Sequence, residues 1–246
     1  MPPGTYPHAR RDPRCPATVQ LFPGTRDARQ PDCDRGRPGA ARRQRGPPLD
    51  RRRRSTHAHP IREAAIAALE AGDTRYGYSQ GTPGLRQALS DYHRRHWDVD
   101  VAPERFCVSI GGMNAVVMAM QAILDEGDEV IMPSPAWPNA KQVVAICGGV
   151  NVAVAFEFHA DGAITLDLDT LFAAVTERTR AIFINSPSNP TGWRMPLADM
   201  QRLRDFCRER GLWIVADEVY NHFVYDGQGP APSFFCSCAT TPTVCW

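Results

Sequence analysis

The 246-residue sequence predicts an α/β fold, a three-layer sandwich in which helices cover both faces of a mostly parallel sheet. Short apolar runs alternate along the chain with segments whose apolar residues recur at helical spacing. The apolar runs are nearly continuous, as expected of strands that are buried on both faces. No apolar stretch reaches the roughly 18 residues that a membrane-spanning helix needs.

The regular part of the chain begins near Pro60 with two predicted helices. Apolar residues recur at helical spacing over residues 61–69, and Gly72 then supplies a stop. A second helix is indicated by Thr82 as N-cap and Pro83 at the first helical position.

An alternation of strands and helices follows. We predict strands over residues 105–110, 129–132, 151–156, 180–185 and 212–216. Between them we predict helices over residues 114–124, 139–147, 168–175 and 196–210. After Tyr225 no usable periodicity remains.

Charge is divided unevenly along the chain. Residues 1–57 carry a net charge of +9 and the remainder −8, which add up to +1. The first segment is rich in Arg and Pro and too poor in apolar residues to fold by itself, so we expect disorder. Three interpretations stay open: a basic arm for nucleic acid, disorder without function, or a frame artefact of GC-rich DNA. No aromatic residue lies among the arginines at 51–54, which makes nucleic acid an unlikely partner.

The cysteines and the N-terminus indicate a compartment. Eight cysteines are spread along the chain without a CxxC pair, and no secretory signal is visible. We therefore expect reduced thiols and a cytoplasmic protein.

Ligands of open α/β sheets bind beyond the carboxyl ends of the strands, so the residues there are candidates for a site. Gly111 and Gly112 precede a helix whose first N–H groups suit an anion, although a glycine pair is equally a plain turn. Trp137 follows the second strand and suits stacking on a flat ring, or packing in the core.

Two further strands end in polar residues. Asn189 lies in a turn that two prolines and a glycine make rigid, where its amide faces a ligand or bonds its own backbone. Asp217 follows an apolar strand, so its carboxylate is partly desolvated and needs a partner. Tyr220 adds a phenol three residues later.

Together these strand ends resemble the class I/II aminotransferases, the pyridoxal-phosphate (PLP) enzymes of fold type I, over about residues 60–230. The stretches 76–86, 185–192 and 216–220 are most similar to the aspartate aminotransferase-like group. The resemblance implies an incomplete large domain of the PLP-dependent transferase type at residues 58–235. It lies between the Arg/Pro-rich residues 1–57 and an irregular tail at 236–246.

The resemblance also implies roles for single residues. Gly112, Met113 and Asn114 match the loop that gives backbone N–H groups to the cofactor phosphate. Trp137 matches the aromatic residue that stacks on the pyridine ring beside the substrate.

Four further roles follow in the same way. Asn189 matches the amide that bonds the cofactor's phenolic oxygen near the substrate carboxylate, and Tyr220 matches the phenol that donates to the same oxygen. Asp217 matches the partner of the pyridine nitrogen. Tyr76 matches the tyrosine that reaches the phosphate of the other subunit, which implies a homodimer.

The family's catalytic lysine, which holds the cofactor as a Schiff base, has no counterpart. Lys141 is the one lysine of the sequence, and it matches no family motif. The family's substrate arginine and small domain are missing too, so we expect a truncated or frame-shifted aminotransferase that is inactive as given. The implied reaction moves an amino group between an L-amino acid and a 2-oxo acid. A lyase or synthase on the same fold, or a non-catalytic binding protein, is the alternative.

Overall fold

The computed structural model describes residues 57–227, 229–237 and 243–245. The chain divides into two compact units, Met1–Ala71 and Gly72–Trp246. In the first unit, α1 (His59–Glu70) begins with Pro60 in its first turn and has no buried residue. The expectations of disorder in residues 1–57 and of a basic arm there fall almost entirely outside the described residues. The division at residues 57 and 235 stays a prediction.

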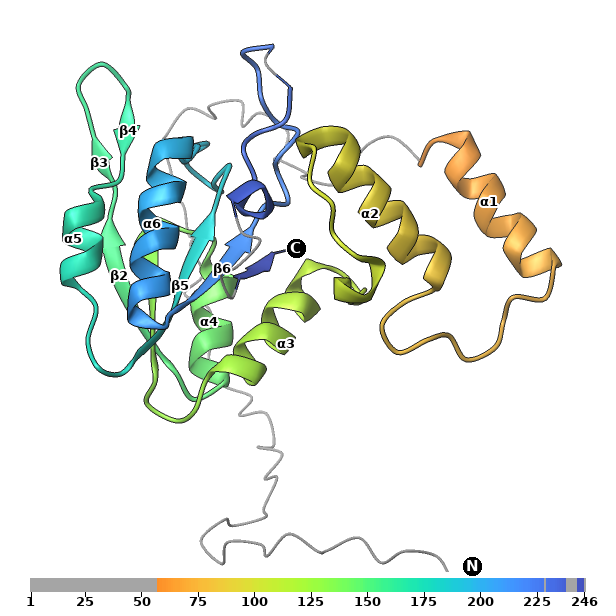
Figure 1. Ribbon diagram of the computed structural model, residues 1–246, viewed down its shortest axis with the longest axis horizontal. Coiled ribbons are helices and arrows are strands. Elements are labelled where there is room, and N and C mark those ends of the chain that lie inside the picture. The colour runs from red at the N-terminus through yellow and green to blue at the C-terminus, as the bar shows by residue number, and fades with distance from the viewer. Residues whose placement is uncertain (1–56, 228, 238–242, 246) are drawn as a thin grey trace, which may run out of the picture. The chain divides into compact units, whose positions relative to one another are not determined.

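The second unit is built on a parallel sheet with the strand order β2-β1-β5-β6-β7 (Figure 1). Each neighbouring pair in this sheet runs parallel, so the predicted sheet type is confirmed. The strands are β1 (Glu129–Ser134), β2 (Val150–Ala155), β5 (Thr179–Asn185), β6 (Trp213–Asp217) and β7 (Thr243–Cys245). A separate antiparallel hairpin joins β3 (Glu157–Phe158) to β4 (Ile164–Thr165), and the sequence did not predict it.

The helices of the second unit lie close to where the periodicity predicts them. Thr82 caps α2 as expected, because its side chain accepts a hydrogen bond from the Leu85 N–H. Gly211 ends α6 in the left-handed conformation at φ 67°. The α-helices are α2 (Pro83–Trp97), α3 (Gly112–Ile123), α4 (Pro138–Ile146), α5 (Leu168–Ala173) and α6 (Leu197–Arg210). Two 3₁₀ turns cover Pro103–Arg105 and Phe234–Ser237.

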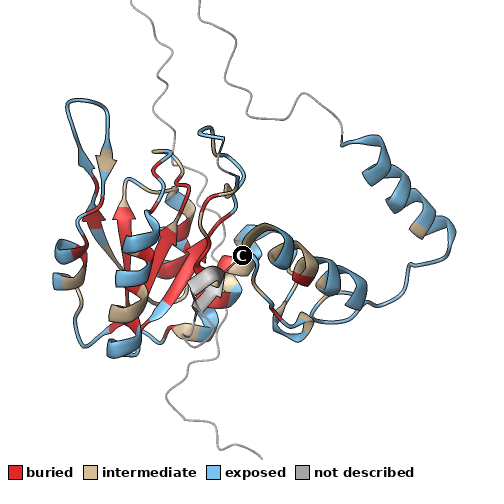
Figure 2. Ribbon diagram, turned by 45° about the horizontal axis from the view of Figure 1, so that its top comes forward, coloured by how far each residue is buried: buried red, intermediate tan, exposed pale blue. Residues whose placement is uncertain are grey.

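Side chains of the central strands alternate between two apolar cores, one on each face of the sheet. Ile182 packs in the core that includes α5 and α6, and its neighbour Phe183 packs in the core that includes α3 and α4. The same alternation separates Ile214 from Val215. Figure 2 shows the buried strands enclosed by helices whose outer faces are exposed. The three-layer arrangement is therefore confirmed.

The prediction of a strand over residues 105–110 is wrong. Arg105 ends a 3₁₀ turn, and the extended residues after it belong to no ladder. Among the described residues, their backbone forms one hydrogen bond to a distant segment, from the Val108 N–H to the Gln80 carbonyl at 3.0 Å. A strand is defined by its hydrogen-bonded partner, and the described part of the chain offers none here.

None of the described helices is both long and apolar enough to cross a bilayer.

Candidate functional site

Three strand ends meet at one edge of the sheet. β1, β5 and β6 are neighbours and run parallel, so their last residues Ser134, Asn185 and Asp217 lie along the same edge. Segments that are about 50 and about 30 residues apart in the sequence thereby become neighbours. The predicted site residues Trp137, Asn189 and Tyr220 follow these ends directly.

Asn185, which the sequence reasoning did not single out, joins two of the predicted residues. It lies opposite Asp217 in the register of β5 and β6. Its Nδ2 donates to the Asp217 carbonyl at 3.0 Å, and its Oδ1 accepts from the Asn189 N–H at 2.7 Å. One side chain therefore holds the backbones of Asp217 and Asn189 together.

The turn that carries Asn189 is closed by its own hydrogen bonds. The Ser188 N–H donates to the Trp193 carbonyl, and the Gly192 N–H donates to the Ser188 carbonyl, both at 2.8 Å. The Trp193 N–H donates to Thr191 Oγ1 at 3.1 Å. These bonds make the turn rigid, as the two prolines predict, and Asn189 is left half-buried on it.

The carboxylate of Asp217 is buried without a matching cation. The residue is 8% exposed, and its Oδ1 accepts from the Val219 N–H at 3.2 Å. No lysine, arginine or histidine within the described ranges forms an ion pair with it. Burial raises the pKa of this carboxyl group. A protonated ring nitrogen of a ligand would compensate the buried charge, so the residue fits the predicted cofactor.

Tyr220 comes three residues after Asp217 in the sequence, and its side chain is half-buried. Its ring meets the Phe223 ring edge-on, with centroids 5.5 Å apart. Its hydroxyl bonds none of the residues that the structure describes, so the phenol is available to a ligand.

The start of α3 offers two backbone donors, whereas the sequence predicts three. Gly111 adopts φ 84°, a left-handed conformation that favours glycine, and the helix begins at Gly112. The Asn114 N–H already donates to the Gly111 carbonyl at 3.1 Å. The N–H groups of Gly112 and Met113 have no acceptor in the described chain. A Cβ on Gly112 would meet nothing within 4 Å, so the space beside this terminus is open.

Trp137 is the N-cap residue of α4 and belongs to neither apolar core. It is partly buried and lines a cavity of about 200 Å³ together with Lys141, Asn151 and the turn after β1. Trp137 is therefore not a core residue, and its ring-stacking role stays a prediction.

Glu218 is a second buried carboxylate that the sequence reasoning missed. It is 7% exposed, and its two oxygens accept from Ser233 Oγ at 2.6 Å and from the Phe234 N–H at 2.7 Å. Burial raises its pKa to about 7. Glu218 also lines a cavity of about 440 Å³ with Leu85 and Leu89 of α2. Two consecutive acids after an apolar strand were the available signal.

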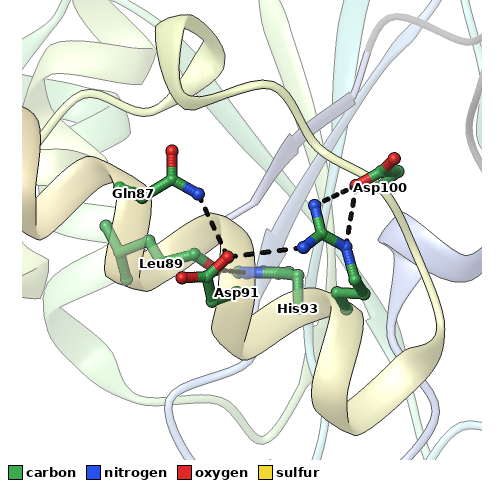
Figure 3. Close-up of polar contacts among 6 residues, drawn as sticks. Gln87, Leu89, Asp91, His93 and Asp100 are labelled. Atoms are coloured by element: carbon green, nitrogen blue, oxygen red, sulfur yellow. Dashed lines mark hydrogen bonds and ion pairs between the residues drawn. The ribbon is translucent and has the colours of Figure 1, made fainter.

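Helix α2 is fixed beside this second cavity. Trp97 Nε1 donates to the Ala231 carbonyl at 2.9 Å. Figure 3 shows a polar network along the same helix and the turn after it. There Arg94 donates to Asp100 at 2.6 Å, and Gln87 donates to Asp91 at 3.0 Å.

Tyr76 differs from the other predicted residues because the chain leaves its ring fully exposed. The structure thus brings Asn189 and Asp217 together through Asn185, and it places Trp137 and Tyr220 after neighbouring strand ends. It does not cover Tyr76.

Comparison with known proteins identifies one family. Residues 49–243 match the family described as aminotransferase class I and II. A probable aspartate/prephenate aminotransferase of Aquifex aeolicus is 40% identical over 176 residues, which are 71% of this chain and 44% of the relative.

Solved structures agree with the sequence match. An aspartate aminotransferase of Thermus thermophilus superposes with a TM-score of 0.68 at 37% identity, covering 75% of this chain and 47% of the other. The N-succinyldiaminopimelate aminotransferase of Mycobacterium tuberculosis has a TM-score of 0.69 at 31% identity, with coverages of 75% and 48%. The chain spans half the length or less of the relatives it matches.

Proposed function

The chain belongs to the class I and II aminotransferases, and from this premise we propose that it binds PLP at the carboxyl ends of β1, β5 and β6. The family is PLP-dependent. The reaction that this lineage implies transfers an amino group between an L-amino acid and a 2-oxo acid. The single observation that carries the proposal is Asp217, a buried carboxylate that has no cation among the described residues and lies in register with Asn185.

The residues at the strand ends would bind the pyridine ring. Asp217 would pair with the ring nitrogen and hold its proton, because an adjacent anion favours the charged form of that nitrogen. Tyr220 and Asn189 would donate to the phenolic oxygen, and Trp137 would stack on the ring. When bound, PLP supplies an electron-withdrawing ring that stabilises negative charge on the substrate carbon.

The phosphate would lie at the start of α3. The free N–H groups of Gly112 and Met113, and the positive end of the helix dipole, favour an anion there. Asn114 would contribute less through its backbone than predicted, because its N–H is already bonded to Gly111.

Binding PLP is a separate property from catalysing transamination. The family's catalytic lysine has no counterpart in these 246 residues. Lys141 is exposed on α4, one turn after Trp137. We propose that the chain by itself holds PLP non-covalently and does not transaminate.

The proposal extends to partners and location. The substrates would be an L-amino acid and a 2-oxo acid, because the relatives are named as aminotransferases. The fully exposed ring of Tyr76 supports a homodimer, in which this tyrosine would reach the cofactor phosphate of the second copy. A cytoplasmic location is supported by the thiols of Cys107 and Cys147, which form no disulfide in the described residues.

Equilibrium dialysis with PLP tests the proposal. We expect the Lys141→Arg variant to retain PLP, and to release it from the site on denaturation after borohydride treatment, since no lysine remains in the chain to form an imine there. Replacing Asp217 with Ala should weaken retention at least about tenfold, the effect of losing roughly 1.4 kcal/mol. Replacing the exposed Glu104 is the matched control. Binding that is equal in all variants would contradict the proposed site.

A further inference from the structure

We propose that Asn185 is the positioning residue of this site, and that it fixes Asp217 and Asn189 at the separation that one bound ring requires. This inference rests on the proposed PLP site. It concerns a residue whose side chain contacts neither ring nor phosphate in that proposal.

Both ends of the Asn185 amide are used, and for different purposes. The bond from Oδ1 to the Asn189 N–H, at 2.7 Å, closes a turn within one segment. The bond from Nδ2 to the Asp217 carbonyl, at 3.0 Å, crosses to a neighbouring strand. A turn-forming asparagine needs only the first bond. The second joins the two segments that carry the opposed ring contacts.

The ladder next to it shows why this extra bond matters. β5 and β6 pair up to Asn185 and Asp217, where both strands end. One further backbone bond, from the Ser186 N–H to the Asp217 carbonyl at 3.1 Å, continues past that point. After this bond, one segment continues into the turn of Asn189 and the other into the segment of Tyr220. The Asn185 side chain therefore couples the two segments at the point where backbone pairing stops.

The required chemistry is specific to an amide. An aspartate at position 185 would keep the acceptor for the Asn189 N–H, but it would lose the donor to the Asp217 carbonyl and add a negative charge. An alanine would lose both bonds. The two variants thus separate the turn bond from the strand-crossing bond.

Thr191 offers a matched control in the same turn. Its Oγ1 accepts from the Trp193 N–H at 3.1 Å, so Thr191→Ala also removes a side-chain bond to the backbone. That bond stays within the turn and does not reach β6.

The experiment measures the binding of pyridoxamine phosphate to the wild type and to Asn185→Asp, Asn185→Ala and Thr191→Ala. This probe carries no aldehyde, so it forms no covalent bond with Lys141 or the N-terminal amine. Affinity comes from equilibrium dialysis, and protonation of the bound ring nitrogen comes from its absorption spectrum as a function of pH.

We expect about a tenfold loss of affinity in both Asn185 variants, the effect of losing one or two hydrogen bonds. Deprotonation of the bound ring should also move to lower pH in Asn185→Ala, because Asp217 is no longer held against the nitrogen. Thr191→Ala should keep the wild-type ring titration even where its thermal stability falls.

The outcomes are distinguishable. Unchanged affinity and ring titration in the Asn185 variants, with a wild type that binds, overturn the positioning role alone. A wild type that does not bind the probe overturns the proposed function and this role with it. If Asn185→Ala does not fold, an unaltered affinity of Asn185→Asp for the probe is sufficient to overturn it.

Discussion

Asp217 and Glu218 are adjacent in the sequence, yet their carboxylates have different surroundings. The oxygens of Glu218 accept bonds from Ser233 and Phe234 of the same chain. Within the described residues, the Asp217 carboxylate accepts one bond, from the Val219 N–H. Both oxygens of Glu218 thus bond other parts of the chain, whereas the Asp217 carboxylate stays available to a ligand.

This difference predicts that Asp217 destabilises the chain when no ligand is bound. Replacing Asp217 with Asn removes a desolvated charge and keeps the side-chain size. We expect the midpoint of thermal unfolding to rise by about 2–4 °C, the shift that roughly 1 kcal/mol gives in a domain of this size. PLP binding should weaken in the same variant. A lower midpoint at neutral pH would show that the carboxylate has a stabilising partner.

The sequence identifies some of these residues and not others, for a physical reason. Asp217 and Trp137 are recognisable because each lies at or shortly after the end of an apolar strand. Asn185 is not, because its role depends on the register between β5 and β6, and register is a relation between distant segments. The occupied N–H of Asn114 was likewise missed, since the first helical residue was expected at Asn114 rather than Gly112.

At the scale of elements, Glu218 connects the end of β6 to the 3₁₀ turn that begins at Phe234. Its pKa is about 7 in the folded chain, against an ordinary value of 4.5. Between these two pH values the folded state binds one proton more than the unfolded state. The free energy of unfolding therefore falls as the pH rises through this window.

We expect this loss to amount to about 3 kcal/mol between pH 4.5 and 7. The raised pKa of Asp217 acts in the same direction. Urea unfolding of the wild type and of Glu218→Gln at several pH values measures the effect as the difference between the two proteins. Glu104→Gln, at an exposed site, is the control. Equal pH dependence in the wild type and Glu218→Gln would contradict the prediction.

Elements are predictable where their stabilising contacts are local or repeat with a clear period. α2 shows this, since its Thr82 cap and Pro83 start are local signals that the structure confirms. The segment at 105–110 has an apolar pattern typical of a strand, but a ladder needs a second strand, and the pattern does not report whether one is present. The two-residue strands β3 and β4 are too short to show a period.

For the whole molecule, the sheet separates two apolar cores. Leu203 lies in one of them and Met120 in the other, and neither residue is exposed. Truncating either to Ala should lower the free energy of unfolding by about 2–5 kcal/mol. Because the sheet lies between them, the two losses should add within about 0.5 kcal/mol.

Urea unfolding of both single variants and the double variant checks this, with all proteins in one sulfate buffer that strengthens apolar burial. A coupling energy above about 1 kcal/mol would contradict the prediction, because it would show that the structure relaxes around both truncations jointly across the sheet.

The central position of β5 has a consequence for the slowest motions of the molecule. This strand pairs with β1 on one side and β6 on the other, and five of its seven residues are buried. Its amides open only in large cooperative unfolding events, so they should be among the last to exchange with deuterated water. Asn185 is the final residue of this strand. The proposed cofactor-binding edge is therefore attached to the backbone expected to open least often, and its geometry should persist through the local fluctuations of the surrounding turns.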